Sequence, residues 1–89
     1  MSFPKRKFTA SDLLPGQTYR VIAPFKDYDG IIHPIGESWR FVKKSFLPYE
    51  DGLSLFVESD GQNLMYRLQW RPEAQGQIID NFSDFVEEV

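Results

Sequence analysis

Residues 64–71 alternate between apolar and polar side chains more strictly than any other stretch of this chain. The apolar positions of that stretch are Leu64, Tyr66, Leu68 and Trp70. Successive side chains of an extended strand point to opposite faces, so this pattern predicts a strand with one face in a core. Asp60-Gly61 before it is typical of a tight hairpin turn, and Pro72 after it cannot donate to a sheet. We therefore expect antiparallel β-structure.

Three further segments have the same character, and turn residues separate them. They span residues 17–25, 38–46 and 53–58. Short strands at roughly ten-residue spacing are typical of a small barrel or sandwich. The long connection 25–37, followed by hairpins, is the chain course of an SH3-like antiparallel barrel, which we predict. The alternative is a strongly bent sheet of four or five strands; both are mainly β and carry a short C-terminal helix.

The tail of the chain changes its period. Its apolar residues recur at steps of three and four, which predicts a helical face, and they are Ile78, Ile79, Phe82, Phe85, Val86 and Val89. Residues 1–10 are interpreted as a flexible N-terminal arm and residues 11–89 as a single globular domain, because 89 residues are too few for two cores. Trp39 and Trp70 both fall on apolar strand faces and are expected in the core.

The composition excludes several classes of protein. Without cysteine the chain can form neither disulfides nor thiolate metal sites, which favours a cytoplasmic location. No apolar run reaches the roughly 20 residues of a membrane-spanning helix, so no membrane contact is expected. The net charge of −3 disfavours general nucleic-acid binding. Positive charge gathers in the first half of the chain and negative charge in the second, which leaves a monomer or a weak homodimer open.

Catalytic and metal chemistry find little support in the residues. His33 is the single histidine, and a metal site there would need carboxylates alone as further ligands. Asp27-Tyr28-Asp29-Gly30 resembles part of a calcium loop, but the other ligand positions do not match. Asp27 or Asp29 could approach His33, so a small hydrolase that uses this histidine is one alternative function. The expectation is a protein that is not an enzyme and has no cofactor.

Aromatic residues in the connections indicate a binding function. In an SH3-like barrel, tyrosines beside an acidic loop form a groove for proline-rich peptides. Asp27 and Asp29 would supply that acidic loop, with Tyr28, Pro48 and Tyr49 as the aromatic and apolar surface. We therefore predict a binding or accessory module that engages a protein or peptide through these five residues.

Basic residues on the polar sides of the strands give a second alternative. Arg40, Lys43, Lys44 and Arg67 would share one outer sheet face if their strands were neighbours. A basic face with interspersed apolar side chains can bind single-stranded nucleic acid or an acidic protein.

Several short motifs together resemble those of a known family. They are Gly16–Val21, Phe25–Gly30, His33–Trp39, Phe46–Leu53 and Arg67–Trp70. The chain resembles, over residues 12–88, a small bacterial family of domains of unknown function. That resemblance implies a cytoplasmic protein that stands alone, and it implies no activity, ligand or catalytic residue.

Overall fold

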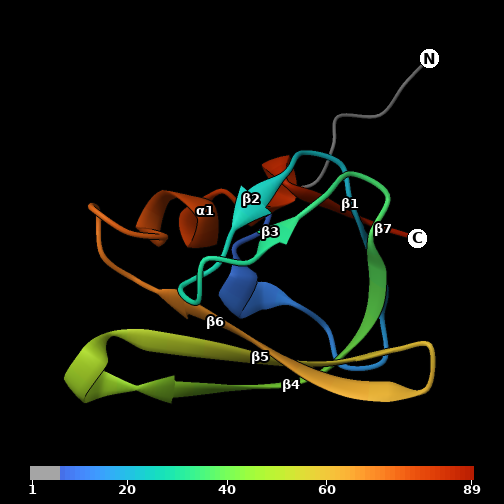
Figure 1. The fold of residues 1–89 in the computed structure, drawn as a ribbon, viewed down its shortest axis with the longest axis horizontal. Helices are drawn as coiled ribbons and strands as arrows, with labels where there is room; N and C mark the ends of the chain where they lie inside the picture. The colour runs from blue at the N-terminus through green and yellow to red at the C-terminus, as the bar shows by residue number, and fades with distance from the viewer. Residues whose placement is uncertain (1–6) are drawn as a thin grey trace.

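The computed structural model describes residues 7–89 and consists mainly of antiparallel β-strands (Figure 1). Five strands form one sheet in the order β6-β5-β4-β1-β7, and β2 and β3 form a separate ribbon. The strands are β1 Thr18–Val21, β2 Phe25–Lys26, β3 Ile32–His33, β4 Ser38–Leu47, β5 Gly52–Ser59, β6 Gln62–Gln69 and β7 Val86–Glu88. The helices are the 3-10 turns η1 Ala10–Asp12, η2 Pro48–Glu50 and η3 Phe82–Asp84, and α1 Gly76–Asp80.

The prediction of a mainly β domain with a short helix is confirmed, but the sheet is not a closed barrel. Within residues 7–89, β6 and β7 are the two ends of the sheet order and do not pair with each other. The space that barrel closure would fill is occupied by the ribbon of β2 and β3, which lies over the concave side of the sheet (Figure 1). The observed sheet agrees with the alternative of a bent sheet, and its SH3-like character is not confirmed.

The C-terminal tail is shorter as a helix than its periodicity predicts. The tail holds the five-residue α1 and the 3-10 turn η3, after which the chain extends into β7, where Val86 pairs with Val21 of β1. Pairing with β1 satisfies the backbone groups of residues 86–88, and this tertiary contact outweighs a weak helical pattern. The start of α1 requires glycine, because a Cβ on Gly76 would lie 2.6 Å from the carbonyl oxygen of Arg71.

The folded domain begins earlier than residue 11. Most of the predicted N-terminal arm, residues 1–6, lies outside the described residues, but Phe8 and Ala10 are buried in the core. The Phe8 carbonyl accepts a hydrogen bond from Ser83, and the Thr9 hydroxyl caps η1 by accepting from the Ser11 amide. Phe8 thus belongs to the core although it lies in the segment that was predicted to be a flexible arm.

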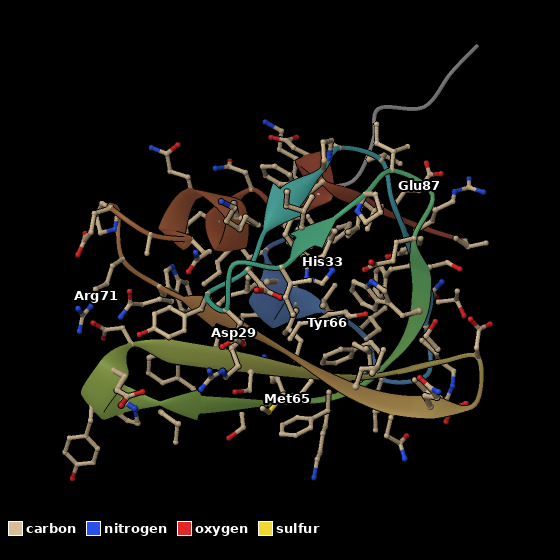
Figure 2. All side chains as sticks on the ribbon, in the orientation of Figure 1. Asp29, His33, Met65, Tyr66, Arg71 and Glu87 are labelled. Atoms are coloured by element: carbon tan, nitrogen blue, oxygen red, sulfur yellow. The ribbon has the colours of Figure 1, made fainter. Side chains whose placement is uncertain are left out.

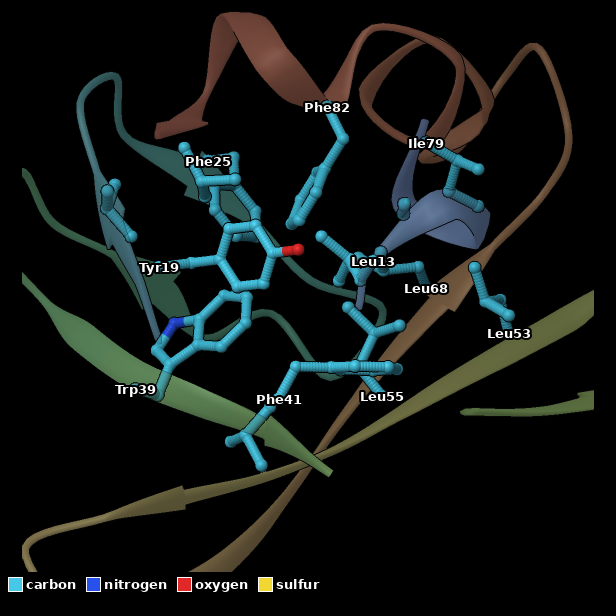
Figure 3. Close-up of a cluster of buried hydrophobic side chains, with 14 of the residues drawn as sticks. Leu13, Tyr19, Phe25, Trp39, Phe41, Leu53, Leu55, Leu68, Ile79 and Phe82 are labelled. Atoms are coloured by element: carbon cyan, nitrogen blue, oxygen red, sulfur yellow. The ribbon is translucent and has the colours of Figure 1, made fainter. Parts of the chain in front are cut away.

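Aromatic rings fill the core between the sheet and the helical segments (Figure 3). Trp39 of β4 is 2% exposed, and its ring centroid lies 5.6 Å from that of Tyr19 and 6.5 Å from that of Phe82. Its predicted burial is confirmed. Trp70, in contrast, is 38% exposed, because it follows the end of β6 and packs edge-on against Phe46 at the rim. The prediction that Trp70 belongs to the core is wrong.

Candidate functional site

The face of β4, β5 and β6 that points away from the core carries the first candidate surface. Leu53, Leu55 and Val57 of β5 are buried, so the side chains between them lie on the other side, which we call the outer face. The strand register places three cross-strand rows there, and they are Lys43/Phe56/Met65, Ser45/Ser54/Arg67 and Leu47/Gly52/Gln69.

A small depression, the Gly52 hollow, lies at the end of this face. Its volume is about 40 Å³, and the residues that line it are Tyr28, Leu47, Glu50, Gly52, Leu53, Ser54, Arg67, Leu68 and Gln69. Drug-sized ligands occupy pockets of roughly 300–1,000 Å³. The hollow is therefore too small for such a ligand but can accept the end of one side chain.

Gly52 is the residue that creates this depression. The chain's six glycines all lie in the described part, and Gly16, Gly30, Gly36 and Gly61 adopt positive φ angles that favour glycine. Gly52 has no such conformation, and a Cβ there would meet only the Cβ of Leu47, at an ordinary 3.9 Å. Glycine inside a strand weakens the strand and often marks a place that another group approaches closely. Neither backbone geometry nor crowding accounts for glycine at this position.

Tyr28 and Arg67 form one wall of the hollow. The Tyr28 amide donates to the Arg67 carbonyl over 2.8 Å, which holds the loop 27–31 against β6. The Arg67 guanidinium carbon lies 5.6 Å from the centre of the Tyr28 ring, and the guanidinium pairs with Asp29. The hydrogen bond from Arg67 lowers the pKa of Asp29 below its ordinary value. This wall is therefore an exposed surface on which the Arg67 guanidinium lies over the Tyr28 ring.

The residues predicted for peptide binding do not all meet at this place. Tyr28 lines the hollow and Asp29 pairs with the lining residue Arg67, whereas Asp27 is 2% exposed and contacts His33. Pro48 and Tyr49 belong to η2, between the lining residues Leu47 and Glu50, but the Tyr49 side chain is 97% exposed and packs on almost nothing. The sequence signal for the hollow was Gly52 at a strand position. It was missed because an Asp51-Gly52 pair is typical of a turn.

The basic residues of the nucleic-acid alternative are each paired within the chain. Arg40 forms an ion pair with Glu58 over 3.0 Å, and Arg67 pairs with Asp29. The Lys44 ammonium donates to the Ser11 hydroxyl. Lys43 lies on the opposite side of the sheet, and its ammonium nitrogen is 5.1 Å from the centre of the Phe56 ring. These four cations do not form one continuous face, since Lys44 lies opposite the core residue Leu55.

A second cleft lies between the end of β6 and α1, with a volume of about 270 Å³. Its polar groups are already engaged, because the Trp70 indole donates to Asp80 over 2.9 Å and Arg71 donates to Asp51 over 3.0 Å. The Trp70 indole and the Arg71 guanidinium are therefore less available to bind a ligand in this cleft.

Beneath the loop 27–31 lies a buried polar cluster centred on His33, and Figure 2 shows His33 and Tyr66 between the β2–β3 ribbon and β6. His33 is 1% exposed, its Nε2 lies 2.8 Å from Asp27 Oδ2, and its Nδ1 lies 2.7 Å from Glu37 Oε1. The imidazole stacks on Phe25 at 4.7 Å and meets the Tyr66 ring edge-on at 4.3 Å. The expected approach of Asp27 to His33 is therefore observed, whereas Glu37 and Tyr66 were not predicted.

The positions of these groups follow from local turns. Asp27 Oδ1 accepts from the amides of Asp29 and Ile31, so its carboxylate holds the loop and the histidine at once. Glu37 is placed beside the ring because Gly36, with φ +95°, turns the chain back towards β1. The Glu37 carbonyl then accepts from the Val21 amide over 2.8 Å. The cluster is a structural clamp between β1, the β2–β3 ribbon and β6.

The same geometry does not support the hydrolase alternative. A general base must reach a substrate proton within hydrogen-bonding distance. Both nitrogens of His33 face carboxylates of the chain itself, and the ring is almost fully buried. Among residues 7–89 no group of three or more His, Asp or Glu side chains is arranged to hold a metal ion.

Tyr66 provides a measurable signature of this cluster. Burial, with the charges of Glu37 and Asp27, raises the pKa of the Tyr66 phenol to about 12 from 10. A raised tyrosine pKa contributes stability that is complete below pH 10 and is lost as the pH rises through about 12. We expect a late phenolate phase in an ultraviolet pH titration, which the Tyr66→Phe variant lacks, and a fall of wild-type urea stability in that window. A late phase that persists in Tyr66→Phe would contradict this assignment.

Comparisons with known proteins agree with the fold and leave the activity open. Residues 3–89 match the model of a family described as a domain of unknown function (DUF3601). A solved structure from the mobile metagenome of Vibrio cholerae, integron cassette protein VCH_CASS4, has a TM-score of 0.85 and 36% sequence identity to this chain. The match covers 88% of this chain and 87% of that one. No curated protein matches the chain. No helix in residues 7–89 is long and apolar enough to cross a membrane.

Proposed function

The chain belongs to this family of domains of unknown function (DUF3601), and we propose that it is a non-catalytic module that binds a peptide segment of a partner protein at the Gly52 hollow. The Vibrio cholerae structure and the cysteine-free composition support a cytoplasmic setting in a bacterium. The proposal keeps Tyr28 as a binding residue and replaces Tyr49 by the residues that line the hollow.

The observation that carries the proposal is the glycine at the start of β5, where a missing side chain leaves a depression on the outer face. Two exposed apolar side chains, Tyr28 and Leu47, line the hollow beside Gly52. Contiguous apolar surface on a sheet face is a common mark of a protein interaction site. The gap at Gly52 adds a concave point to that surface, and concave points are where anchor side chains of a partner insert.

The lining indicates the chemistry of the bound segment. The Leu47 side chain and the Tyr28 ring provide apolar contact for one aromatic or branched aliphatic side chain. Gln69 and Glu50 also line the hollow, and the Gln69 amide oxygen and the Glu50 carboxylate can accept hydrogen bonds from peptide amides beside that anchor. The domain would thus recognise one apolar side chain of the peptide and the backbone amides next to it.

The experiment is a selection of linear peptides from a display library on the immobilised full chain, followed by affinity measurement with Gly52→Val. Valine suits a strand, its Cβ has space at this position, and its methyl groups fill the hollow. Because burial of one large apolar side chain contributes about 1.5–3 kcal/mol, the affinity should fall about tenfold or more.

Tyr49→Ala is the matched control, since it removes a far more exposed aromatic ring from the adjacent turn and should leave the affinity unchanged. Equal affinity of the wild type and Gly52→Val, or a loss that Tyr49→Ala alone produces, would overturn the proposed site.

A further inference from the structure

A continuous series of contacts joins the buried histidine to the wall of the Gly52 hollow. Glu37 contacts His33 Nδ1 at 2.7 Å, and His33 Nε2 contacts Asp27 at 2.8 Å. The other Asp27 oxygen accepts from the Asp29 and Ile31 amides at 2.9 and 3.0 Å. Those two hydrogen bonds shape the loop that carries Tyr28. The loop therefore has two attachments, Asp27 on the inside and Arg67 on the outside.

The hydrogen-bonding capacity of these groups defines the charge of the ring. An ionised carboxylate can only accept hydrogen bonds, so neither Asp27 nor Glu37 can donate to the ring. A neutral imidazole has one donor and one acceptor nitrogen, so it can satisfy only one of the two carboxylates that it faces. The imidazolium donates from both nitrogens. The observed geometry is complete only when His33 carries both ring protons.

We infer that His33 is a positioning residue for the Gly52 hollow: its imidazolium joins Asp27 to Glu37 and thereby holds the Tyr28 loop in the shape that binds peptide. The inference rests on the proposed function for its effect on binding, whereas its effect on the loop is independent of any ligand. When the ring loses one proton, a lone pair faces one of the two carboxylates at less than 3 Å, and the ring no longer joins Asp27 to Glu37. Peptide binding is then weaker than with the doubly protonated ring.

The groups around the ring are consistent with this assignment. β2 contributes the uncharged face of Phe25, and its Lys26 is exposed on the opposite side of the strand. β6 contributes Tyr66, which stays neutral below about pH 12, and Arg67, which pairs with Asp29. The remaining charged groups that face the imidazole are Asp27 and Glu37. Two negative carboxylates and no cation therefore surround the ring among these elements.

The test follows the ring nitrogens of His33 and the amides of Asp29 and Ile31 together in an NMR pH titration of the full chain. In the wild type we expect the ring and both amides to change with one common midpoint. In Glu37→Gln the amide group of glutamine can donate to the deprotonated nitrogen, so the loop amides should no longer follow the ring. Loop amides that ignore the ring in the wild type, or that follow it equally in Glu37→Gln, would overturn the inference.

A ring that is already neutral at neutral pH in the folded wild type would also overturn the inference. If the ring keeps both protons throughout, the decisive variant is His33→Gln, whose single amide group cannot satisfy both carboxylates. Its Asp29 and Ile31 amides should then exchange with solvent roughly tenfold faster relative to the Leu55 amide, as loss of one charge-assisted hydrogen bond predicts. Equal exchange would refute the positioning role.

Affinity for the peptide selected on the wild type separates the two proposals. If Gly52→Val abolishes binding but loss of the ring proton leaves the affinity unchanged, the hollow is the site and the inference about His33 is wrong. If the loop follows the ring while Gly52→Val binds like the wild type, the clamp is real and the proposed function is wrong. The combined proposal predicts roughly tenfold weaker binding in both cases.

Discussion

Replacing Trp39 by alanine is expected to destabilise the domain by about 3–5 kcal/mol, the range measured for large aromatic residues removed from cores. The indole is 2% exposed, and its ring packs among Tyr19, Tyr66 and Phe82, so its loss leaves a cavity that these rings cannot fill without moving. Domains of this kind have a total stability of only about 5–15 kcal/mol. Urea unfolding should therefore show a much lower midpoint, or no folded baseline at all.

Trp70→Ala is the matched control for that variant. The same indole is removed, but from a half-exposed position at the rim, where it contacts Phe46 and donates to Asp80. We expect a loss of about 1–2 kcal/mol, which combines one hydrogen bond with partial burial. Equal destabilisation by the two substitutions would contradict the placement of Trp39 in the core and Trp70 outside it.

Asp27→Ala is expected to cost about 3–5 kcal/mol, because it removes the buried acceptor of three donors, and each donor left unsatisfied costs about 1–3 kcal/mol. The carboxylate is 2% exposed and accepts hydrogen bonds from His33 and from two backbone amides. All three donors would lose their acceptor at once. The measurement is urea unfolding at neutral pH, monitored by the fluorescence of the buried Trp39.

Asp29→Ala tests the same prediction from the same loop. Asp29 pairs with Arg67 at the surface, and exposed ion pairs contribute only about 0–1 kcal/mol. The two aspartates look alike in the sequence, where both were predicted as an acidic peptide-binding loop. If Asp29→Ala destabilises as much as Asp27→Ala, the buried clamp is not the feature that holds the loop.

Much of the sheet could be predicted from local pattern. The strand β6 and the hairpin at Asp60-Gly61 follow from strict alternation and turn chemistry, because both signals depend only on neighbouring residues. Barrel closure and the C-terminal helix were predicted less well, since they depend on contacts between distant segments. The pairing of Val86 with Val21 illustrates this, because nothing in residues 78–89 alone distinguishes it from the face of a helix.

The candidate site was predictable in part for the same reason. His33 and Asp27 lie close in the chain, so their contact could be anticipated, but Glu37 required knowledge of the turn at Gly36. Gly52 looks like a turn residue in the sequence, because the absence of a side chain becomes informative only when its strand neighbours Leu47 and Gln69 are known. The place of Tyr49 in a connection favoured it as a binding residue, but the fold leaves its side chain isolated.

The ribbon of β2 and β3 links the stability of the domain to its proposed binding surface. Its inner side carries Phe25 and His33 into the core, and the loop at its tip places Tyr28 beside Arg67 on the outer face. The β2–β3 ribbon thus covers the open side of the sheet, and its loop forms one wall of the hollow. Substitutions inside the clamp should for this reason affect stability and binding together, whereas Gly52→Val should affect binding alone.

The most direct test of the account is chemical-shift mapping of a library-selected peptide on the isotope-labelled wild-type chain. We predict that the largest amide changes cluster at Tyr28, Gly52, Ser54 and Arg67, around the hollow. Changes centred instead on the cleft between Trp70 and Asp80, with the residues of the hollow unaffected, would contradict the claim that the outer face at Gly52 is where this domain binds its partner.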